Sequence, residues 1–290
     1  MTNGAQATAI KTVDDLFAVI PQFTSHHATS GAVWRLWNTA ARDAVDTLFR
    51  ASGVTPIPFS VFGDLVFPYI EMGAINSLDL FGMDELIIFA FYHANRHRYR
   101  RVVDFGANIG LHSTILGRCG FEVRSFEPDP VHIGLLEKTL SNNHIKTELH
   151  RTAISVEDGE MEFVRVLGNT TGSHLAGAKA APYGQLERFI VKVESARPHL
   201  EWADLAKIDI EGHEASLICS LPPDIWLKTD AVLEVGTAVN AAAIYDYLST
   251  SKVRMMAQKT GWQEVKSLAD MPTSHRDGSL FLTSKDQMPW

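Results

Sequence analysis

The sequence is poor in cysteine, with only Cys119 and Cys219 among 290 residues. So few thiols argue against a secreted disulfide scaffold, and we expect both to be free thiols in a reducing compartment. Basic residues are also outnumbered, with 26 Lys and Arg against 34 Asp and Glu, which gives a formal net charge of −8. Because nucleic acids and anionic membranes usually select a basic surface, we expect neither as a partner.

Long apolar segments are lacking as well. The longest one, Leu86–Tyr92, is far too short to cross a bilayer. Residues 1–9 are small and polar, so they do not have the charged and then apolar composition of a signal peptide. These absences together predict a cytoplasmic protein. The 46% of hydrophobic residues is ordinary for a globular chain and is enough for a sizeable core.

Residues 1–83 predict a helical and hairpin extension. Apolar residues recur at helical spacing in the second of two predicted helices, Val13–Ile20 and Ala32–Ala51. Three short runs rich in β-branched and aromatic residues follow, and glycines separate them, which is typical of hairpins. These runs are Ile57–Phe62, Leu65–Glu71 and Ala74–Leu80. We expect the extension to pack on the domain formed by residues 84–290, and it is also a candidate surface for a homodimer.

Residues 84–290 begin with an apolar helix, Asp84–Asn95, and then alternate short apolar strands with helices. This alternation predicts an α/β fold with a seven-stranded, mostly parallel, Rossmann-like sheet that is doubly wound, with helices on both faces. The predicted strands are Arg101–Phe105, Glu122–Phe126, Thr147–Ala153, Leu205–Ile210, Ala231–Val235, Gln263–Val265 and Ser279–Leu282. The predicted helices are Ile109–Arg118, Val131–Asn142, Glu214–Ser220 and Ala241–Thr250.

An extra strand pair, Glu160–Val166 and Phe189–Val193, is predicted before the fourth main strand. Between the two strands lies the loop Leu167–Tyr183, which is rich in small residues and long enough to act as a functional lid. His174 in this loop is a candidate catalytic base, although a single loop histidine is more often simply solvated.

A buried strand runs into a glycine turn and then a helix at Val102–Gly110. Glycines let the backbone approach a ligand closely, and the following helix offers free N–H groups. Asp104 precedes the first glycine, where its carboxylate would repel a pyrophosphate and suit an ammonium or sulfonium group. The spacing Gly106-x-x-x-Gly110 also differs from the G-x-G-x-x-G of dinucleotide enzymes. The turn therefore indicates a positively charged ligand without phosphates.

Glu127 closes the next predicted strand, where an acid can accept hydrogen bonds from both hydroxyls of a ribose. Taken singly, Asp104 also suits a helix N-cap, and Glu127 also suits a turn. Taken together, at the ends of adjacent strands, they favour a cofactor that carries a ribose and a sulfonium, S-adenosylmethionine.

A charged cluster follows the fourth main strand. Alternate residues of an extended segment share a face, so Lys207, Asp209 and Glu211 lie on one side. Asp209 is the best candidate for a catalytic base or a metal ligand, and Glu211 and Glu234 are candidates to complete an oxygen-rich divalent site. Lys207 is a candidate for pairing with an acid or lowering the pKa of an acceptor. A salt-bridged structural cluster is the alternative, above all for Glu211 and Glu214.

Four segments together resemble the signature blocks of FkbM-type methyltransferases. They are Asp104–Gly110, Phe126–Asp129, Ala153–Ser155 with Asp158-Gly159, and Lys207–Glu214. The resemblance implies the class I methyltransferase sheet with a reversed last strand and the cofactor S-adenosylmethionine. It also implies that the cofactor-binding residues are Asp104, Gly106, Ala107, Asn108, Gly110, Glu127, Pro128, Ala153, Ile154 and Asp209. Val191–Pro198 lacks the family's threonine-leucine-aspartate turn, and residues 1–80 match nothing in it.

The sequence thus predicts an S-adenosylmethionine-dependent methyltransferase, with an oxygen of a sugar or secondary-metabolite hydroxyl as the expected methyl acceptor. Transfer to a peptide side-chain amide nitrogen is an alternative within the class. A nicotinamide-dependent oxidoreductase and a non-catalytic binding protein are alternatives from other classes. The acceptor is expected to be a small molecule or a glycan, and the need for a divalent metal ion stays open.

Overall fold

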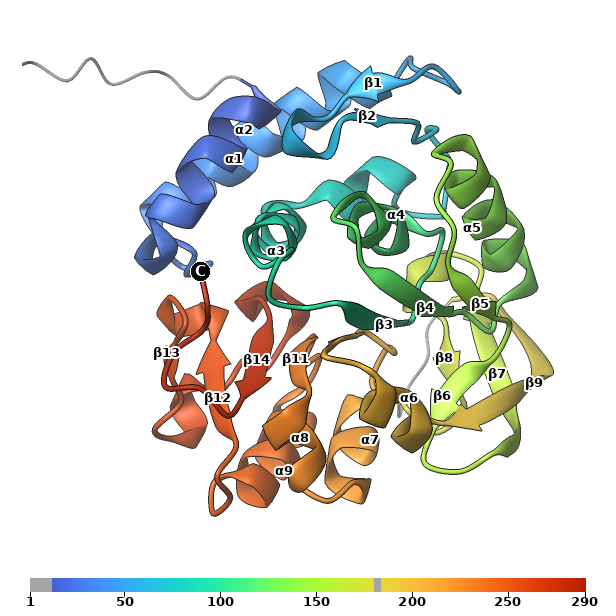
Figure 1. The fold of residues 1–290 in the computed structure, drawn as a ribbon. Coiled ribbons are helices and arrows are strands. Elements are labelled where there is room, and N and C mark those ends of the chain that lie inside the picture. The colour runs from blue at the N-terminus through green and yellow to red at the C-terminus, as the bar shows by residue number, and fades with distance from the viewer. Residues whose placement is uncertain (1–11, 180–183) are drawn as a thin grey trace, which may run out of the picture.

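The computed structural model describes residues 12–179 and 184–290, whose centre is one large mixed sheet (Figure 1). Within those residues the sheet has eight strands, and the first five in the order below run parallel. The sixth, β14, runs antiparallel to both of its neighbours. In order across the sheet the strands are β5 (Glu148–His150), β4 (Glu122–Phe126), β3 (Arg101–Phe105), β10 (Leu205–Ile208), β11 (Asp230–Leu233), β14 (Leu280–Thr283), β12 (Arg254–Ala257) and β13 (Gln263–Glu264).

The strand order reverses between β3 and β10. From β3 the chain continues outward through β4 and β5, and it later returns to the other side of β3 as β10. In a sheet wound this way, ligands bind outside the carboxyl ends of the strands at the reversal point. The predicted doubly wound α/β sheet and its reversed last strand are confirmed. The predicted number of seven strands is wrong, because Arg254–Ala257 adds β12 to the described sheet. The position of a candidate site follows from the topology.

Helices cover both faces of the sheet (Figure 1). Strand side chains alternate between the faces, so Val102 and Leu205 join one hydrophobic cluster while Val103 and Ala206 join the other. Because both faces are covered, β10, β11 and β14 consist mostly of apolar residues instead of alternating between apolar and polar ones. On one face lie α3 (Met83–Ala94), α4 (Leu111–Arg118) and α5 (Pro130–Asn142), and on the other α6 (Ala196–Trp202), α7 (Glu214–Ser220), α8 (Asp224–Lys228) and α9 (Ala238–Leu248).

The N-terminal segment packs outside α3 and α4, as expected for the predicted extension, whose first eleven residues lie outside the described residues (Figure 1). It contains α1 (Val13–Val19), α2 (Ala32–Phe49), β1 (Ile57–Pro58) and β2 (Asp64–Leu65). Its aromatic core centres on Phe59, whose ring centroid lies 5.5 to 5.9 Å from those of four other phenylalanines. The boundary at residue 83 stays a prediction.

The predicted hairpins in this segment are wrong in part. Among the described residues of this segment, β1 and β2 pair over two residues each, and Glu71 and Asn76 form a single antiparallel bridge between the second and third predicted runs. Ala74–Leu80 does not form a strand but leads into a 3₁₀ helix, Ser77–Phe81, because Asn76 and Asp79 cap each other's backbone at its start. Within Leu65–Glu71, Pro68 has no N–H to donate to a strand partner.

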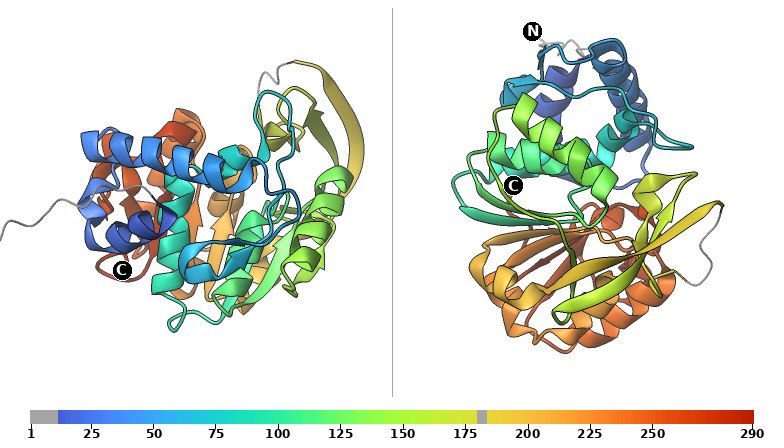
Figure 2. Two further views of the ribbon diagram at one scale, coloured as in Figure 1. Left: turned by 90° about the horizontal axis from the view of Figure 1, so that it is seen from above. Right: turned by 90° about the vertical axis from the view of Figure 1, so that its right-hand side faces the viewer.

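A second sheet of four strands, in the order β6-β9-β7-β8, lies beside β5 (Figure 2). The predicted pair is confirmed here as β7 and β9, which run antiparallel. The predicted strand Thr147–Ala153 is divided, because the chain leaves β5 in the main sheet and forms β6 in the second one. The bounds are β6 (Ala153–Ser155), β7 (Gly159–Val166), β8 (His174–Leu175) and β9 (Leu186–Ser195).

Two further observations concern the cysteines and the possibility of a membrane-spanning helix. Cys119 and Cys219 are both free thiols. Among the described helices, none is both long enough and apolar enough to span a membrane.

Candidate active site

The glycine turn after β3 is held between β4 and β10. The backbone N–H groups of Gly106 and Ala107 both donate to the carbonyl of Phe126, at 3.1 and 2.9 Å. Gly106 has φ +79°, and a Cβ there would lie 1.8 Å from the backbone oxygen of Asp209. Only glycine permits this approach, because both the conformation and the space exclude a side chain. The turn thus places a backbone segment without a side chain at the point where the strand order of the sheet reverses.

Glu127 follows β4 and is 95% buried, since only 5% of its surface is exposed. Its two carboxylate oxygens accept hydrogen bonds from the backbone N–H groups of Asn108 and Asp129, both at 2.9 Å. Burial raises the pKa of Glu127 to about 8, although these hydrogen bonds act in the opposite direction. A carboxylate has about four acceptor positions, so two are left for a ligand.

A cavity enclosing about 900 Å³ of empty space, partly open to solvent, lies over these strand ends. One part of its wall is apolar and includes Phe126 and Phe163. The predicted residues that line it come from the glycine turn, from the segments after β4, β10 and β11, and from β6 and β8. They are Gly106, Asn108, Glu127, Pro128, Ala153, Ile154, His174, Asp209, Glu211 and Glu234. Sequence motifs far apart in the chain therefore meet at one cavity.

Asp104 and Lys207 are placed behind this cavity. Asp104 is fully buried, accepts a hydrogen bond from Ser113 Oγ at 2.6 Å, and lies 3.3 Å from Lys207 Nζ. Lys207 also donates to the carbonyl of Gly106 at 2.7 Å. Asp104 is not among the cavity's lining residues, so a contact of its carboxylate with the ligand stays a prediction. In the structure Asp104 pairs with Lys207, and Lys207 in turn holds the turn.

Lys207 carries a positive charge at this place. Burial acts to lower its pKa, but the carboxylates of Asp104 and Asp209 raise it above the ordinary value. A lysine held as a cation cannot take a proton from an acceptor. With Ala107 it lines a smaller hollow beside the cavity, while Gly110 lines neither space.

Acidic side chains gather at the ends of β10 and β11. Asp209 and Glu234 follow these strands directly, and Glu211 lies in the next turn with φ +56°. Burial, and then the charge of Asp209, raises the pKa of Glu211 to about 7 and that of Glu234 well above its ordinary value. Carboxylates that repel one another where water is scarce are stabilised by any cation that enters. The cavity therefore favours a positively charged ligand.

The alternative of a structural role, in place of a catalytic or metal-binding one, fits Glu214 and in part Glu211. Glu214 accepts hydrogen bonds from the backbone N–H groups of Ile210, at 2.9 Å, and Gly212, at 3.0 Å, and so fixes the turn before α7. Glu211 forms an ion pair with Lys179 at 2.6 Å. Glu214 is consequently occupied with backbone, whereas Glu211 still reaches the cavity wall.

The oxygen-rich metal site suggested by Asp209, Glu211 and Glu234 stays a prediction. Their oxygens do not gather within 4.8 Å of one another in the structure. The side chains that do so in the described part of the chain are His150, Glu194 and His199, outside the cavity.

His174 lies in β8 and is buried in the cavity wall. Its Nδ1 is 2.9 Å from the carbonyl oxygen of Gly172. Because a carbonyl only accepts, Nδ1 carries the proton and Nε2 keeps its lone pair. Burial lowers the pKa of His174, so the ring is neutral at neutral pH and is suited to take a proton.

The loop predicted as a lid forms one wall of the cavity. Its lining residues are Thr170, Thr171, Ser173, His174 and Leu175. Residues 180–183 lie outside the described residues, and movement of the loop stays a prediction.

Sequence reasoning missed Glu85, which lines the cavity from α3. Its carboxylate is 2.7 Å from His112 Nε2, and His112 Nδ1 is 3.1 Å from the Tyr92 hydroxyl. Burial acts to raise the pKa of Glu85, but His112 lowers it overall, so a further negative charge faces the cavity. The available signal was an acid next to the apolar run Leu86–Tyr92.

A second, larger depression adjoins the cavity and shares Glu211 and Glu234 with it. It encloses about 1650 Å³, largely open to solvent. Its other polar lining residues include Lys179, His213, Glu214, Ser216, Thr237, Asn240 and His275.

No protein-family model matches the chain, and neither does any curated protein sequence. Solved structures similar to it include cofactor-bound Rv0187 from MTB, at 13% identity and a TM-score of 0.36, covering 91% of this chain and 94% of that one. An rRNA methylase from Streptococcus thermophilus is 12% identical, with a TM-score of 0.37 and coverage of 68% and 93%. The O-methyltransferase TomG from Streptomyces achromogenes, in complex with SAM, is 11% identical, with a TM-score of 0.34 and coverage of 67% and 77%. These likenesses are too distant to carry an argument about function.

Proposed function

We propose that this chain is an S-adenosylmethionine-dependent methyltransferase that binds its cofactor in the cavity at the ends of β3, β4 and β10. The observation that carries the proposal is the placement of Glu127. Its buried carboxylate lines the cavity and keeps acceptor positions that two ribose hydroxyls match. The bare backbone at Gly106 supports a close approach by the same ligand.

The residues present fit the other parts of this cofactor. Phe126, Ile154 and Phe163 supply apolar surface for an adenine ring. Asp209, Glu211 and Glu234 supply the negative charge that a sulfonium needs. The same charge opposes a pyrophosphate, which weakens the case for a nicotinamide cofactor.

When bound, the cofactor supplies an activated methyl group, and the chain positions an acceptor and takes its proton. His174 and Asp209 line the cavity and are the groups we assign to receive the acceptor's proton. The second depression is where we place the acceptor, because it meets the cavity at Glu211 and Glu234.

For the finer assignment we propose an FkbM-type methyltransferase that acts in the cytoplasm on a hydroxyl oxygen of a sugar-like or secondary-metabolite acceptor. The support is the set of four sequence blocks, each of which contributes at least two lining residues to the cavity. Hydroxyl, amide and carboxylate groups around the second depression match an acceptor with several hydroxyls.

Isothermal titration with S-adenosylhomocysteine and, separately, with NADH tests the proposal. We expect S-adenosylhomocysteine to bind and NADH not to bind. Glu127→Gln should weaken the binding of S-adenosylhomocysteine by about tenfold or more, because the amide has one oxygen acceptor where the carboxyl group has two oxygens. Glu122→Gln, an exposed position at the opposite end of β4, is the matched control and should bind like the original protein. NADH binding without S-adenosylhomocysteine binding would overturn the proposal.

Transfer of labelled methyl groups from S-adenosylmethionine to panels of hydroxyl and amide compounds then separates the two acceptor classes. We expect label on the hydroxyl compounds. Label on amides alone would show that the methyl acceptor is a nitrogen. Cofactor binding without transfer to any compound would favour a non-catalytic binding protein.

A further inference from the structure

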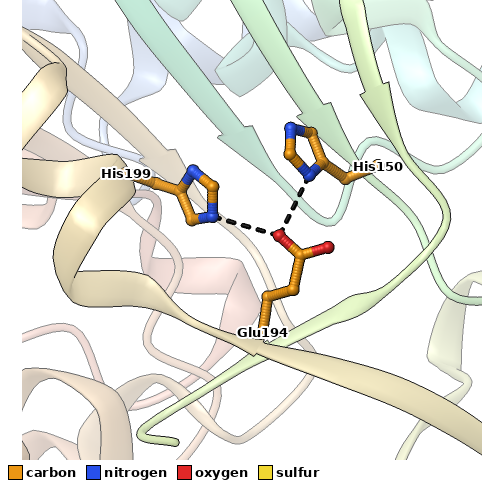
Figure 3. A group of neighbouring side chains, drawn as sticks. All are labelled: His150, Glu194 and His199. Carbon is orange, nitrogen blue, oxygen red and sulfur yellow. Dashed lines mark hydrogen bonds and ion pairs between the residues drawn. The ribbon is translucent and has the colours of Figure 1, made fainter. Parts of the chain in front are cut away.

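Three side chains outside the cavity converge on one point (Figure 3). They are His150 at the end of β5, Glu194 in β9 and His199 in α6. Glu194 Oε2 lies 3.0 Å from His150 Nδ1 and 3.1 Å from His199 Nε2. Among the described residues this is the group of three potential ligands whose atoms all lie within 4.8 Å of one another.

His150 has a carboxylate on both sides of its ring. Nδ1 faces Glu194 Oε2, and Nε2 lies 3.1 Å from Glu148 Oε1. A neutral imidazole has one N–H, and a carboxylate only accepts, so both contacts are favourable only when a second proton or a metal ion sits on the ring. A metal ion at Nδ1 meets this need while the Nε2–H donates to Glu148. A carboxylate behind the ligating ring is the usual second partner of a metal-bound histidine.

Glu194 is also oriented for a ligand. Thr152 Oγ1 donates to its Oε1 at 3.0 Å and leaves Oε2 to the two histidines. The three side chains are 17%, 31% and 13% exposed in the order His150, Glu194 and His199, so an ion can reach them from solvent.

The environment of His199 is compatible with a ligand role. Arg124 lies 3.5 Å from Nδ1, too far for a firm hydrogen bond, and it is held by Glu148 at 2.9 Å and over the Trp202 ring. Metal binding at Nε2 places the ring proton on Nδ1, where only this weak contact with Arg124 is lost, and it replaces the contact between Nε2 and Glu194 by an ion bound to both.

We propose that His150 Nδ1, Glu194 Oε2 and His199 Nε2 bind a divalent transition-metal ion, Zn²⁺ in the first place, with water as a fourth ligand. Two imidazoles and one carboxylate are ligands that zinc takes readily in tetrahedral sites. Mg²⁺ prefers oxygen ligands in an octahedron, so this set discriminates against it.

The position of the site assigns it a structural role. None of the three side chains is among the cavity's lining residues. The Phe126 ring, which does line the cavity, lies 4.3 Å from the His150 ring and 4.6 Å from the His199 ring. The carbonyl of His150 also accepts a hydrogen bond from the Glu127 backbone at 3.1 Å. An ion bound here would cross-link β5, β9 and α6 directly behind the cavity wall.

The test uses the full chain, stripped with a chelator and then titrated with Zn²⁺ or Mg²⁺. We expect one equivalent of Zn²⁺ to bind and to raise the melting temperature, and Mg²⁺ to do neither. Glu194→Gln and His199→Asn should each weaken Zn²⁺ binding at least about tenfold and remove the rise in melting temperature. The control His97→Gln changes an exposed histidine and should leave both readouts unchanged.

The proposal is overturned if Zn²⁺ does not bind in a 1:1 ratio, or if Glu194→Gln and His199→Asn bind it as the original protein does. Circular dichroism identifies a variant that does not fold, and the other variant then decides. Because neither readout involves S-adenosylmethionine, the result is independent of the proposed function.

Discussion

Gly106 is the residue at which the turn has least room for change. Replacing it with alanine puts a Cβ 1.8 Å from a backbone oxygen of Asp209, in addition to the strain of φ +79°. Gly120 has φ +87° and nothing within 4 Å of a Cβ, so Gly120→Ala carries the strain alone. We expect Gly106→Ala to lower the free energy of unfolding by at least about 2 kcal/mol more than Gly120→Ala, as measured in urea. Equal losses in the free energy of unfolding would show that the close approach between Gly106 and Asp209 does not contribute to the effect of the substitution.

Lys207 and Asp104 form a buried ion pair whose loss should be costly. Lys207→Met leaves the fully buried Asp104 carboxylate without its cation, so we expect a loss of about 3–5 kcal/mol in the free energy of unfolding. Asp104→Asn removes the charge, and adding it to Lys207→Met should restore much of the stability. Urea unfolding of both single variants and the double variant measures this coupling. Additive losses would contradict the pairing.

At the scale of elements, the acidic ends of β4, β10 and β11 predict how stability depends on pH. Glu127 and Glu211 have pKa values raised from 4.5 to about 8 and about 7, chiefly by burial. A carboxyl group with a raised pKa in the folded state adds stability at low pH and loses that contribution as pH rises from 4.5 through the folded value. The buried histidines have lowered pKa values, and their contribution is complete above about pH 6.5.

The unliganded protein should therefore lose stability between pH 6.5 and pH 8.5, by about 1–2 kcal/mol for Glu127 alone. Urea unfolding at the two pH values measures the change. Glu127→Gln should show a smaller difference between the two pH values, whereas Glu122→Gln should behave like the original protein. Stability that rises over this range would contradict the raised pKa values.

The elements differ in how far the sequence predicts them. The predicted strands Arg101–Phe105 and Glu122–Phe126 match β3 and β4 to the residue, because their buried apolar residues are β-branched or aromatic, which favours strands. Arg254–Ala257 was missed as β12, because two methionines carry little strand preference. The division of Thr147–Ala153 between two sheets was also missed, because it depends on partners far away in the chain.

The candidate site was predictable where it follows from strand order. Glu127, Asp209 and Glu234 each follow a parallel strand, and the ends of such strands meet at one edge of the sheet. Glu85 was missed, because an acid beside the apolar run Leu86–Tyr92 does not show where α3 packs, and α3 reaches the cavity only through tertiary packing. The placement of Asp104 behind Lys207 depends in the same way on side-chain packing between β3 and β10.

At the scale of the whole molecule, the N-terminal segment and the main sheet share one hydrophobic cluster. We therefore expect them to unfold together. Phe59→Ala, in the fully buried aromatic core of that segment, should lower a single melting transition and cost about 3–5 kcal/mol. Phe23→Ala, in the same segment but 45% exposed, is the control and should change little. Two separate transitions in calorimetry would contradict a shared core. A homodimer through this segment stays a prediction.

The most direct measurement of the central claim is a crystal structure with S-adenosylhomocysteine bound. We predict both ribose hydroxyls within about 3 Å of the Glu127 carboxylate and the sulfur on the side of Asp209 and Glu234. A ligand found elsewhere, or a Glu127 side chain turned away from the ribose, would contradict the account.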